Sequence, residues 1–369
     1  MFPGPHLGHL RRSAVAGGGN PAAGGVAAGG VAADSGGSTH AELRARLADD
    51  GYLFLPGLNG RAATLAARDV VLDHFAAQGG VLVGADVAPR REGVLEARCG
   101  VGCVPFMEGA NGVTGHPAVL GGVLESAALR AFFDGLFGGE SRTFDFKWLR
   151  GVPTGRFTGA HCDIVYMGRG THELVTSWLP FGENPAEMGS LAILAGSHSL
   201  PGFARLRRTY GEMDHERDGL DGTGWLTMDP AEPARFGGRW LTADFSPGDV
   251  LVFGMQTMHM STTNVTRRVR VSCDVRWQAA AAPADPRYVG EIDIAAFAKA
   301  GLGKEEVDDI AGAVAAGPAT PEEEGGGEAA AEPKVTIGEL KAKWGIVPDE
   351  AEVTAAWEAA AVADDQSST

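Results

Sequence analysis

The chain of 369 residues is long enough for one large domain with extensions at both ends. Its net charge is −16, of which residues 281–369 account for 13, so the rest is nearly neutral and offers no broad basic surface for nucleic acid. No run approaches the roughly 18 consecutive apolar residues of a membrane-spanning helix. Four scattered cysteines exclude a disulfide framework and favour a reducing compartment.

The N-terminal residues 1–38 are rich in Gly and Ala and have no acidic residue before Asp34. This composition predicts a disordered tail or, because Arg11 and Arg12 are present, an organellar transit peptide. We therefore expect a cytoplasmic protein, with an organellar one as the alternative. The sequence leaves the oligomeric state open, and we expect a monomer.

Ordered structure is predicted from residue 39. Residues 41–49 have the pattern of a short helix, and Tyr52–Leu55 reads as a strand closed by Pro56 and Gly57. A second helix is expected to start at an Asn59 cap and to end at two glycines, 79 and 80.

From about residue 142 the hydrophobic period changes to two, as in strands. Strand-like runs cover 143–148, 173–181, 190–194, 240–245, 250–253 and 269–277. Many short strands separated by Gly, Pro and Asn favour a jelly roll over a βαβ sheet. We predict a mainly β (α+β) class, with a double-stranded β-helix (jelly roll, cupin-like) core and flanking N-terminal helices over residues 39–290.

Two further segments interrupt or follow this core. The Gly-rich, charged segment 199–239 is too long for an ordinary connection and is expected to form a lid. Residues 291–369 form an acidic, partly helical C-terminal extension with a disordered linker at 317–333. Its helical stretch at 336–344 is expected to pack weakly or not at all, and neither tail is expected to contact the site.

Three residues suggest a metal centre. His161 and Asp163 are two positions apart, so on a strand both side chains project from the same face. His259, which follows a strand-like run, can supply a third ligand. Two histidines and one carboxylate leave open coordination positions, which is typical of non-haem Fe(II) oxygenases.

Arg270 and Ser272 form a second pair on one strand face, eleven residues after His259. A guanidinium offers a planar, two-pronged donor to a carboxylate, and a hydroxyl adds a further hydrogen bond. The pair therefore fits the far carboxylate of a 2-oxoglutarate whose other end binds the iron, with a position left for O2.

The chain resembles the phytanoyl-CoA dioxygenase (PhyH-like) family of Fe(II)/2-oxoglutarate-dependent oxygenases over about residues 41–290. The matching motifs are Asp50-Gly-Tyr-Leu-Phe-Leu-Pro56, His161-Cys-Asp163, Thr176-Ser-Trp-Leu-Pro180, Gly189-Ser-Leu-Ala-Ile-Leu-Ala-Gly-Ser-His198, Phe245-Ser-Pro-Gly-Asp-Val-Leu-Val-Phe253, His259 and Arg270.

The resemblance implies iron ligands at His161, Asp163 and His259, and cofactor contacts at Arg270, Ser261 and Trp178. It also implies that Fe(II), 2-oxoglutarate and O2 are used, with ascorbate as a supporting reductant. Related halogenases carry Gly or Ala in place of the carboxylate, so Asp163 indicates hydroxylation or another oxidation.

Two alternatives stay open: a cupin-type metal enzyme that does not use 2-oxoglutarate, and a catalytically silent metal-binding homologue. A small organic substrate is expected, with neither nucleic acid nor a membrane as partner. Its identity and the type of oxidation cannot be derived, nor can it be decided whether Arg268, Arg276 or lid residues contact it.

Overall fold

The computed structural model describes residues 8–13, 38–77, 110–152, 154–266, 268–290 and 335–346. Its strands are β1 (Gly8–His9), β2 (Tyr52–Leu55), β3 (Ser141–Thr143), β4 (Trp148–Val152), β5 (Val175–Pro180), β6 (Leu191–Ala195), β7 (Leu220–Asp221), β8 (Arg239–Thr242), β9 (Val250–Gly254), β10 (His259–Ser261), β11 (Arg270–Ala279) and β12 (Val335–Thr336). Its α-helices are α1 (His40–Asp50), α2 (Arg61–Ala77), α4 (Ala110–Thr114), α5 (Pro117–Val119), α6 (Ala127–Phe137), α7 (Ile164–Met167), α8 (Ala204–Arg208), α9 (Ala231–Ala234) and α12 (Ile337–Trp344). Short 3-10 or π turns are η2 (Leu120–Leu124), η3 (Pro201–Phe203), η4 (Tyr210–Glu212) and η5 (Pro286–Tyr288).

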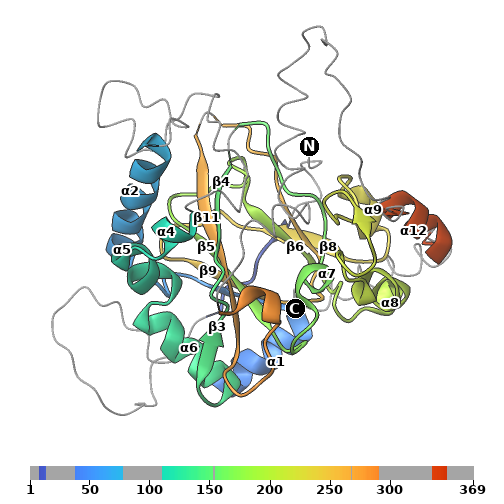
Figure 1. Ribbon diagram of the computed structural model, residues 1–369, viewed down its shortest axis with the longest axis horizontal. Coiled ribbons are helices and arrows are strands. Elements are labelled where there is room, and N and C mark those ends of the chain that lie inside the picture. Colours follow the sequence, from blue (N-terminus) through green and yellow to red (C-terminus); the bar gives the residue numbers. More distant parts are fainter. Residues whose placement is uncertain are drawn as a thin grey trace, which may run out of the picture.

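Two sheets form the core, as the jelly-roll prediction requires. The major sheet has the order β2-β9-β5-β11-β3, with β4 also paired to β11, and the minor sheet has the order β1-β8-β6-β10. Neighbouring strands are antiparallel except for the parallel β1–β8 pair. Helices α2, α4, α5 and α6 lie on one side of the sheets, and α8, α9 and α12 gather on the other (Figure 1). The mainly β, double-stranded β-helix prediction is confirmed.

Strand β11 is buried along nearly its whole length, but its two faces differ in chemistry. Side chains alternate between the faces of a strand. One face packs against the helices with the residues Val271, Cys273, Val275 and Trp277. The opposite face, which we call the inner face, carries Arg270, Ser272, Asp274 and Arg276. The inner face therefore supplies buried charges to the space between the sheets.

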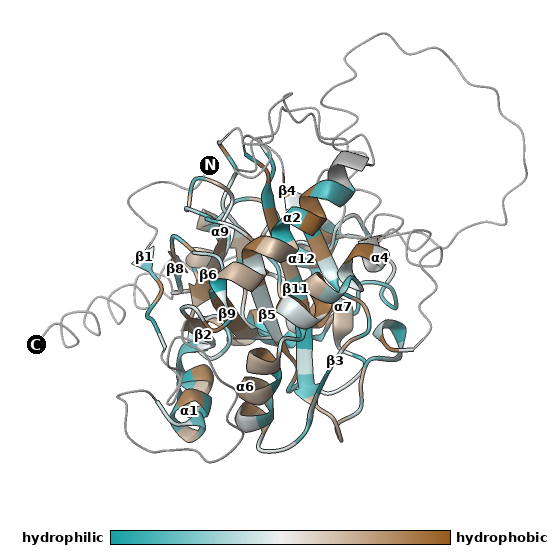
Figure 2. Ribbon diagram, turned by 90° about the vertical axis from the view of Figure 1, so that its left-hand side faces the viewer, coloured by the Kyte–Doolittle hydropathy of each residue, from teal (hydrophilic) through white to brown (hydrophobic). Residues whose placement is uncertain are grey.

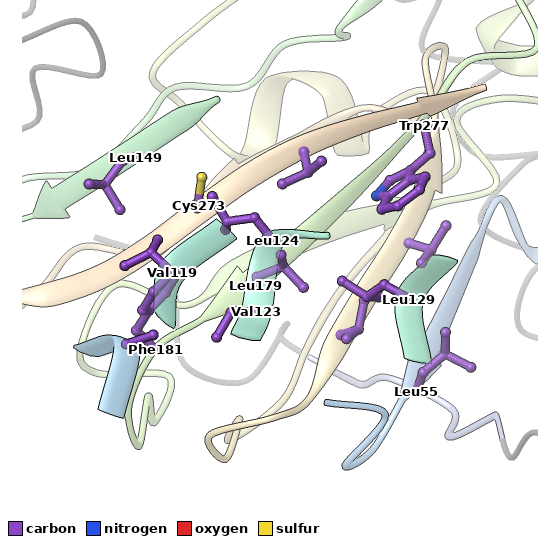
Figure 3. Packing of buried hydrophobic residues seen from close by; sticks show 14 of the residues in the cluster. Leu55, Val119, Val123, Leu124, Leu129, Leu149, Leu179, Phe181, Cys273 and Trp277 are labelled. Carbon is purple, nitrogen blue, oxygen red and sulfur yellow. The ribbon is translucent and has the colours of Figure 1, made fainter. Parts of the chain in front are cut away.

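The helical layer and the major sheet share an apolar core. Figure 3 shows Val119, Val123, Leu124 and Leu129 from the helical layer packing toward strand residues such as Trp277. Helix α2 carries both hydrophobic and hydrophilic segments, as expected of a helix with one face on a sheet (Figure 2). This packing fixes the outer face of the major sheet and hence the direction of its inner side chains.

A separate apolar cluster joins the two sheets. Its members are Tyr52, Phe54, Trp178, Leu251 and Phe253 from the major sheet and Leu191, Ile193, Leu241, Ala243 and Phe245 from the minor sheet and the residues that follow it. The rings of Phe54 and Phe245 meet edge to face at 5.1 Å, an arrangement that contributes about 1 kcal/mol beyond area burial. The cluster holds the inner faces of the two sheets together.

Several local expectations need correction. Asn59 does not cap α2, because its amide donates to the Val123 carbonyl and accepts from the Ser126 hydroxyl. The strand expected at 143–148 is divided, since β3 ends at Thr143 and β4 begins at Trp148. Both strands pair with β11, at different parts of its length.

Part of the N-terminal segment belongs to the fold. Gly8 and His9 pair with β8, and the Ser13 amide donates to the Phe54 carbonyl at 2.5 Å. Residues 8–13 thus connect an edge of the minor sheet with an edge of the major sheet. The expectation that residues 1–38 form a separate tail is wrong for these residues.

The predicted C-terminal helix is confirmed as α12, but it packs against the segment 199–239. Strand β12 pairs with β7, and Lys341 forms an ion pair with Glu232. Leu340 and Ile346 are buried in the apolar cluster that includes this segment. The expected linker at 317–333 lies outside the described residues. In the part of the chain that is described, no helix has the length and hydrophobicity to span a membrane.

Candidate metal centre

The three predicted ligands come together on two adjoining segments. His161 and His259 form an antiparallel bridge in which each backbone amide donates to the other's carbonyl, at 3.0 and 2.9 Å. Asp163 lies at the N-terminal end of α7 with helical backbone angles, so the expectation that it shares a strand with His161 is wrong. The turn into α7 nevertheless directs its carboxylate to the histidines.

The ligand atoms are close enough to share one ion. Oδ1 of Asp163 lies 4.0 Å from Nε2 of His161 and 3.8 Å from Nε2 of His259. All three ligand atoms lie within 4.8 Å of one another, and theirs is the one such group found among the described residues. Metal–ligand bonds of about 2.1 Å need donors on the order of 3 to 4 Å apart, so the group fits a small divalent metal after minor contraction.

Backbone carbonyls fix the orientation of both imidazoles. Nδ1 of His161 lies 2.8 Å from the Gly159 carbonyl, and Nδ1 of His259 lies 3.0 Å from the Thr257 carbonyl. A carbonyl only accepts, so each Nδ1 must carry the proton and each neutral ring must present its Nε2 lone pair. Such bonds commonly orient metal-binding histidines.

Burial keeps both rings neutral. It lowers the pKa of His161 from 6.5 to about 3, and the neighbouring His259 adds to the effect. Burial likewise lowers the pKa of His259. At neutral pH both Nε2 atoms are therefore free of protons, as metal binding requires.

Two residues that the sequence reasoning did not assign hold Asp163. Burial by itself would raise the pKa of this carboxyl, but the Arg276 guanidinium, the two histidines and the Thr176 hydroxyl hold its pKa well below the usual range. Nη2 of Arg276 donates to Oδ1 at 3.2 Å, and Thr176 donates to Oδ2. Period-two alternation places Thr176 on the face of Trp178, which is the signal that could have identified it.

The predicted cofactor residues are buried on the inner face. Nη1 of Arg270 donates to the Gly189 carbonyl at 2.7 Å, and its guanidinium carbon lies 5.8 Å from the centre of the Trp178 ring. Ser272 is completely buried, and its hydroxyl has no hydrogen-bond partner within the described ranges. The hydroxyl of Ser261, by contrast, already accepts from the Thr158 amide at 2.8 Å.

The segment 199–239 reaches the metal centre. The Leu226 amide donates to the Ala160 carbonyl, and the Ala160 amide donates to the Thr227 carbonyl, both at 2.8 Å. Ala160 directly precedes His161, so this segment lies at the edge of the triad.

The chain is similar over 67% of its length to the epimerase SnoN crystallised with Fe3+, alpha ketoglutarate and nogalamycin RO, at 19% identity, with 86% of that chain covered and a TM-score of 0.46. It is similar to EctD from S. alaskensis, crystallised with 2-oxoglutarate and 5-hydroxyectoine, at 18% identity and a TM-score of 0.45, and the match covers 70% of this chain and 83% of EctD. AviO1 from Streptomyces viridochromogenes Tue57 is similar at 18% identity and a TM-score of 0.42, and the match covers 67% of this chain and 98% of AviO1.

No curated protein gave a significant match to the chain. The family model of phytanoyl-CoA dioxygenase (PhyH) matches residues 146–272, a range that includes His161, Asp163, His259 and the Arg270-Val-Ser272 pair. Residues 146–272 therefore make up a phytanoyl-CoA dioxygenase (PhyH) domain, the domain of a family of non-haem iron, 2-oxoglutarate-dependent oxygenases.

Proposed function

We propose that His161, Asp163 and His259 bind the Fe(II) of this oxygenase, which oxidises a C–H bond of a small organic substrate and releases succinate and CO2. The buried triad carries the proposal, because its two Nε2 atoms and one carboxylate oxygen converge within 4.8 Å. Two histidines and a carboxylate on one side of an iron leave open positions for co-substrate and O2. The catalytic domain would span residues 39–290, with 199–239 as a lid and 291–369 as an extension.

The inner face of β11 supports 2-oxoglutarate as the co-substrate. Arg270 is only 2% exposed, so its charge is almost wholly removed from water, and the adjoining Trp178 ring excludes water further. The hydroxyl of Ser272 is buried without a partner among the described residues, which is unfavourable unless a ligand accepts its hydrogen. Together the two side chains would bind the far carboxylate of 2-oxoglutarate, and Ser261 is likewise buried.

The chain's residues would position reactants and exclude water. Gly159 and Thr257 hold the imidazoles, Thr176 and Arg276 hold the carboxylate, and the contacts of Leu226 and Thr227 with Ala160 close one edge of the site. Bound Fe(II) with 2-oxoglutarate and O2 supplies the oxidant that removes hydrogen from the substrate. A buried site protects the substrate from competing reactions with solvent.

The two alternatives are less well supported. A cupin-type enzyme without 2-oxoglutarate has no use for the buried Arg270 and Ser272 pair. A homologue without catalytic activity would not need to retain the three ligands together with the carbonyls that orient the histidines and the two side chains that bind the carboxylate.

The test is iron binding together with succinate formation. Purified protein is reconstituted with Fe(II) and assayed with 2-oxoglutarate, ascorbate and O2, alone and with pools of candidate substrates. His161→Ala and His259→Ala should each lose both iron and turnover, whereas His172→Ala, which changes an exposed histidine, should lose neither. Wild-type succinate formation by His161→Ala would disprove the ligand assignment.

A further inference from the structure

Arg276 has more hydrogen-bonding capacity than its neighbours use. Its side chain is buried at 3% exposure, its Nε donates to the Met167 sulfur at 3.1 Å, and its Nη2 donates to Asp163. Its Nη1 has no acceptor anywhere in the described ranges of the chain. Leaving a buried charged donor without a partner costs free energy, so this nitrogen indicates a group that is bound during function.

The charges of the site point to the same conclusion, on the basis of the function proposed above. Bound Fe(II) and 2-oxoglutarate neutralise each other, and Arg270 offsets Asp163. Arg150 on β4 and Asp274 on β11 form an ion pair at 3.0 Å. Arg276 is paired with Asp163 at 3.2 Å, but two guanidiniums, Arg270 and Arg276, then share this one carboxylate, so the site keeps one net positive charge. A buried charge of this kind is strongly unfavourable unless an anion joins it.

We propose that Nη1 of Arg276 binds a carboxylate of the substrate, so that the enzyme oxidises small organic acids. A carboxylate provides one negative charge, which balances the net charge of the site, and oxygen acceptors for the Nη1 of Arg276. Because the same guanidinium contacts the metal ligand Asp163, the carboxylate lies near the metal, and the C–H bonds close to it are those presented for oxidation.

Trp148 gives the site an apolar side. The guanidinium carbon of Arg276 lies 4.5 Å from the centre of the Trp148 ring, which in turn packs against Phe146 at 4.7 Å and Tyr288 at 5.2 Å. The ring shields one face of the guanidinium and adds a cation–π interaction. Such an aromatic surface suits the hydrocarbon part of an organic acid.

The test measures binding, so it does not depend on finding the substrate. Protein loaded with Zn(II) and 2-oxoglutarate, which cannot turn over, is titrated calorimetrically with a panel of aliphatic and aromatic carboxylates, each paired with its neutral amide. In wild-type protein at least one carboxylate should bind about tenfold more tightly than its amide, the ratio expected for one charge-assisted contact. Arg276→Gln should bring that ratio close to one, and Arg276→Lys should restore part of it.

Arg268→Gln is the matched control, since it removes one positive charge from an exposed position near the start of β11 and should leave the ratio unchanged. The proposal is overturned if no carboxylate is preferred by the wild type, if Arg276→Gln keeps the preference, or if sulfonates of the same skeletons bind more tightly. Weaker Zn(II) binding by Arg276→Gln with an unchanged ratio would also overturn it, because Arg276 would then only position Asp163. Failure of the wild type to bind Zn(II) and 2-oxoglutarate would instead contradict the function proposed above.

Discussion

Thr176 donates its hydroxyl hydrogen to Oδ2 of Asp163, and this contact leaves Oδ1 to face both histidines. The two residues belong to different elements, since Thr176 lies on β5 and Asp163 directly precedes α7. A central strand of the major sheet thereby sets the rotation of the carboxylate that we propose to bind the metal.

Replacing Thr176 with Val removes this hydroxyl while keeping the branched shape of the side chain. We expect iron affinity to fall by roughly ten- to a hundredfold, as is typical when a partner of a metal ligand is lost. Competition with a calibrated Fe(II) chelator measures the change. Thr176→Ser keeps the hydroxyl and should stay near the wild type, and equal loss in both variants would point to packing instead.

Arg270→Ala should raise the 2-oxoglutarate concentration needed for half-maximal turnover by at least about tenfold, because a buried charge-assisted contact is lost. Arg268→Ala, at an exposed position on the same segment, is the control. Steady-state assays of succinate formation compare the two. A larger effect at Arg268 would transfer the role to that residue.

The metal-free protein should lose stability as the pH falls from about 6.5 towards 3. The pKa of His161 is lowered to about 3 in the folded protein and that of His259 is also lowered, so below 6.5 the unfolded chain takes up protons that the folded one does not. Urea unfolding at several pH values measures how steeply the free energy of unfolding changes with pH. His161→Gln should reduce this slope by the equivalent of about one proton, whereas His172→Gln should not. Equal slopes in the wild type and His161→Gln would contradict the assignment.

In a chain that ends at residue 334, the segment 199–239, which we propose to be a lid, should be less stable. It would lose the β12–β7 pairing, the Lys341–Glu232 ion pair and the buried Leu340. We expect a lower melting temperature and faster hydrogen exchange at residues 220–227, while iron still binds. Within the full chain, Leu340→Ala should reproduce part of the effect, and Lys343→Ala, which alters an exposed residue, should not. Unchanged hydrogen exchange in the truncated protein would show that residues 335–346 do not stabilise the segment 199–239.

The chemistry-bearing residues were predictable because each is tied to a short local pattern. His161 and Asp163 are neighbours in sequence, and Arg270 and Ser272 lie on one strand whose alternation is visible in the residues themselves. Only the local conformation was wrong: a strand was expected at Asp163, where the chain enters α7. Two side chains that are two residues apart can come together in more than one backbone geometry. His161 and Asp163 therefore lie close together although the predicted strand is wrong.

Contacts between distant segments could not be predicted in the same way. Nothing in the Gly-rich N-terminal sequence indicates that Gly8 pairs with Leu241, because a two-residue strand has no period to detect. Thr176 and Arg276 were visible as inner-face residues, but their shared partner Asp163 depends on how α7 meets the sheet. Lys341 and Glu232 likewise come together only through the fold.

The packing of α12 against the segment 199–239 also bears on how the protein is assembled during translation. All three proposed metal ligands have been synthesised once His259 is made, but residues 335–346, which pack against the segment 199–239, follow later in the chain. At ribosomal rates of about 5–20 residues per second, the intervening stretch takes on the order of several seconds. The nascent protein thus has an interval in which the proposed ligands exist and the segment 199–239 is not yet covered by α12, and iron could enter during this interval.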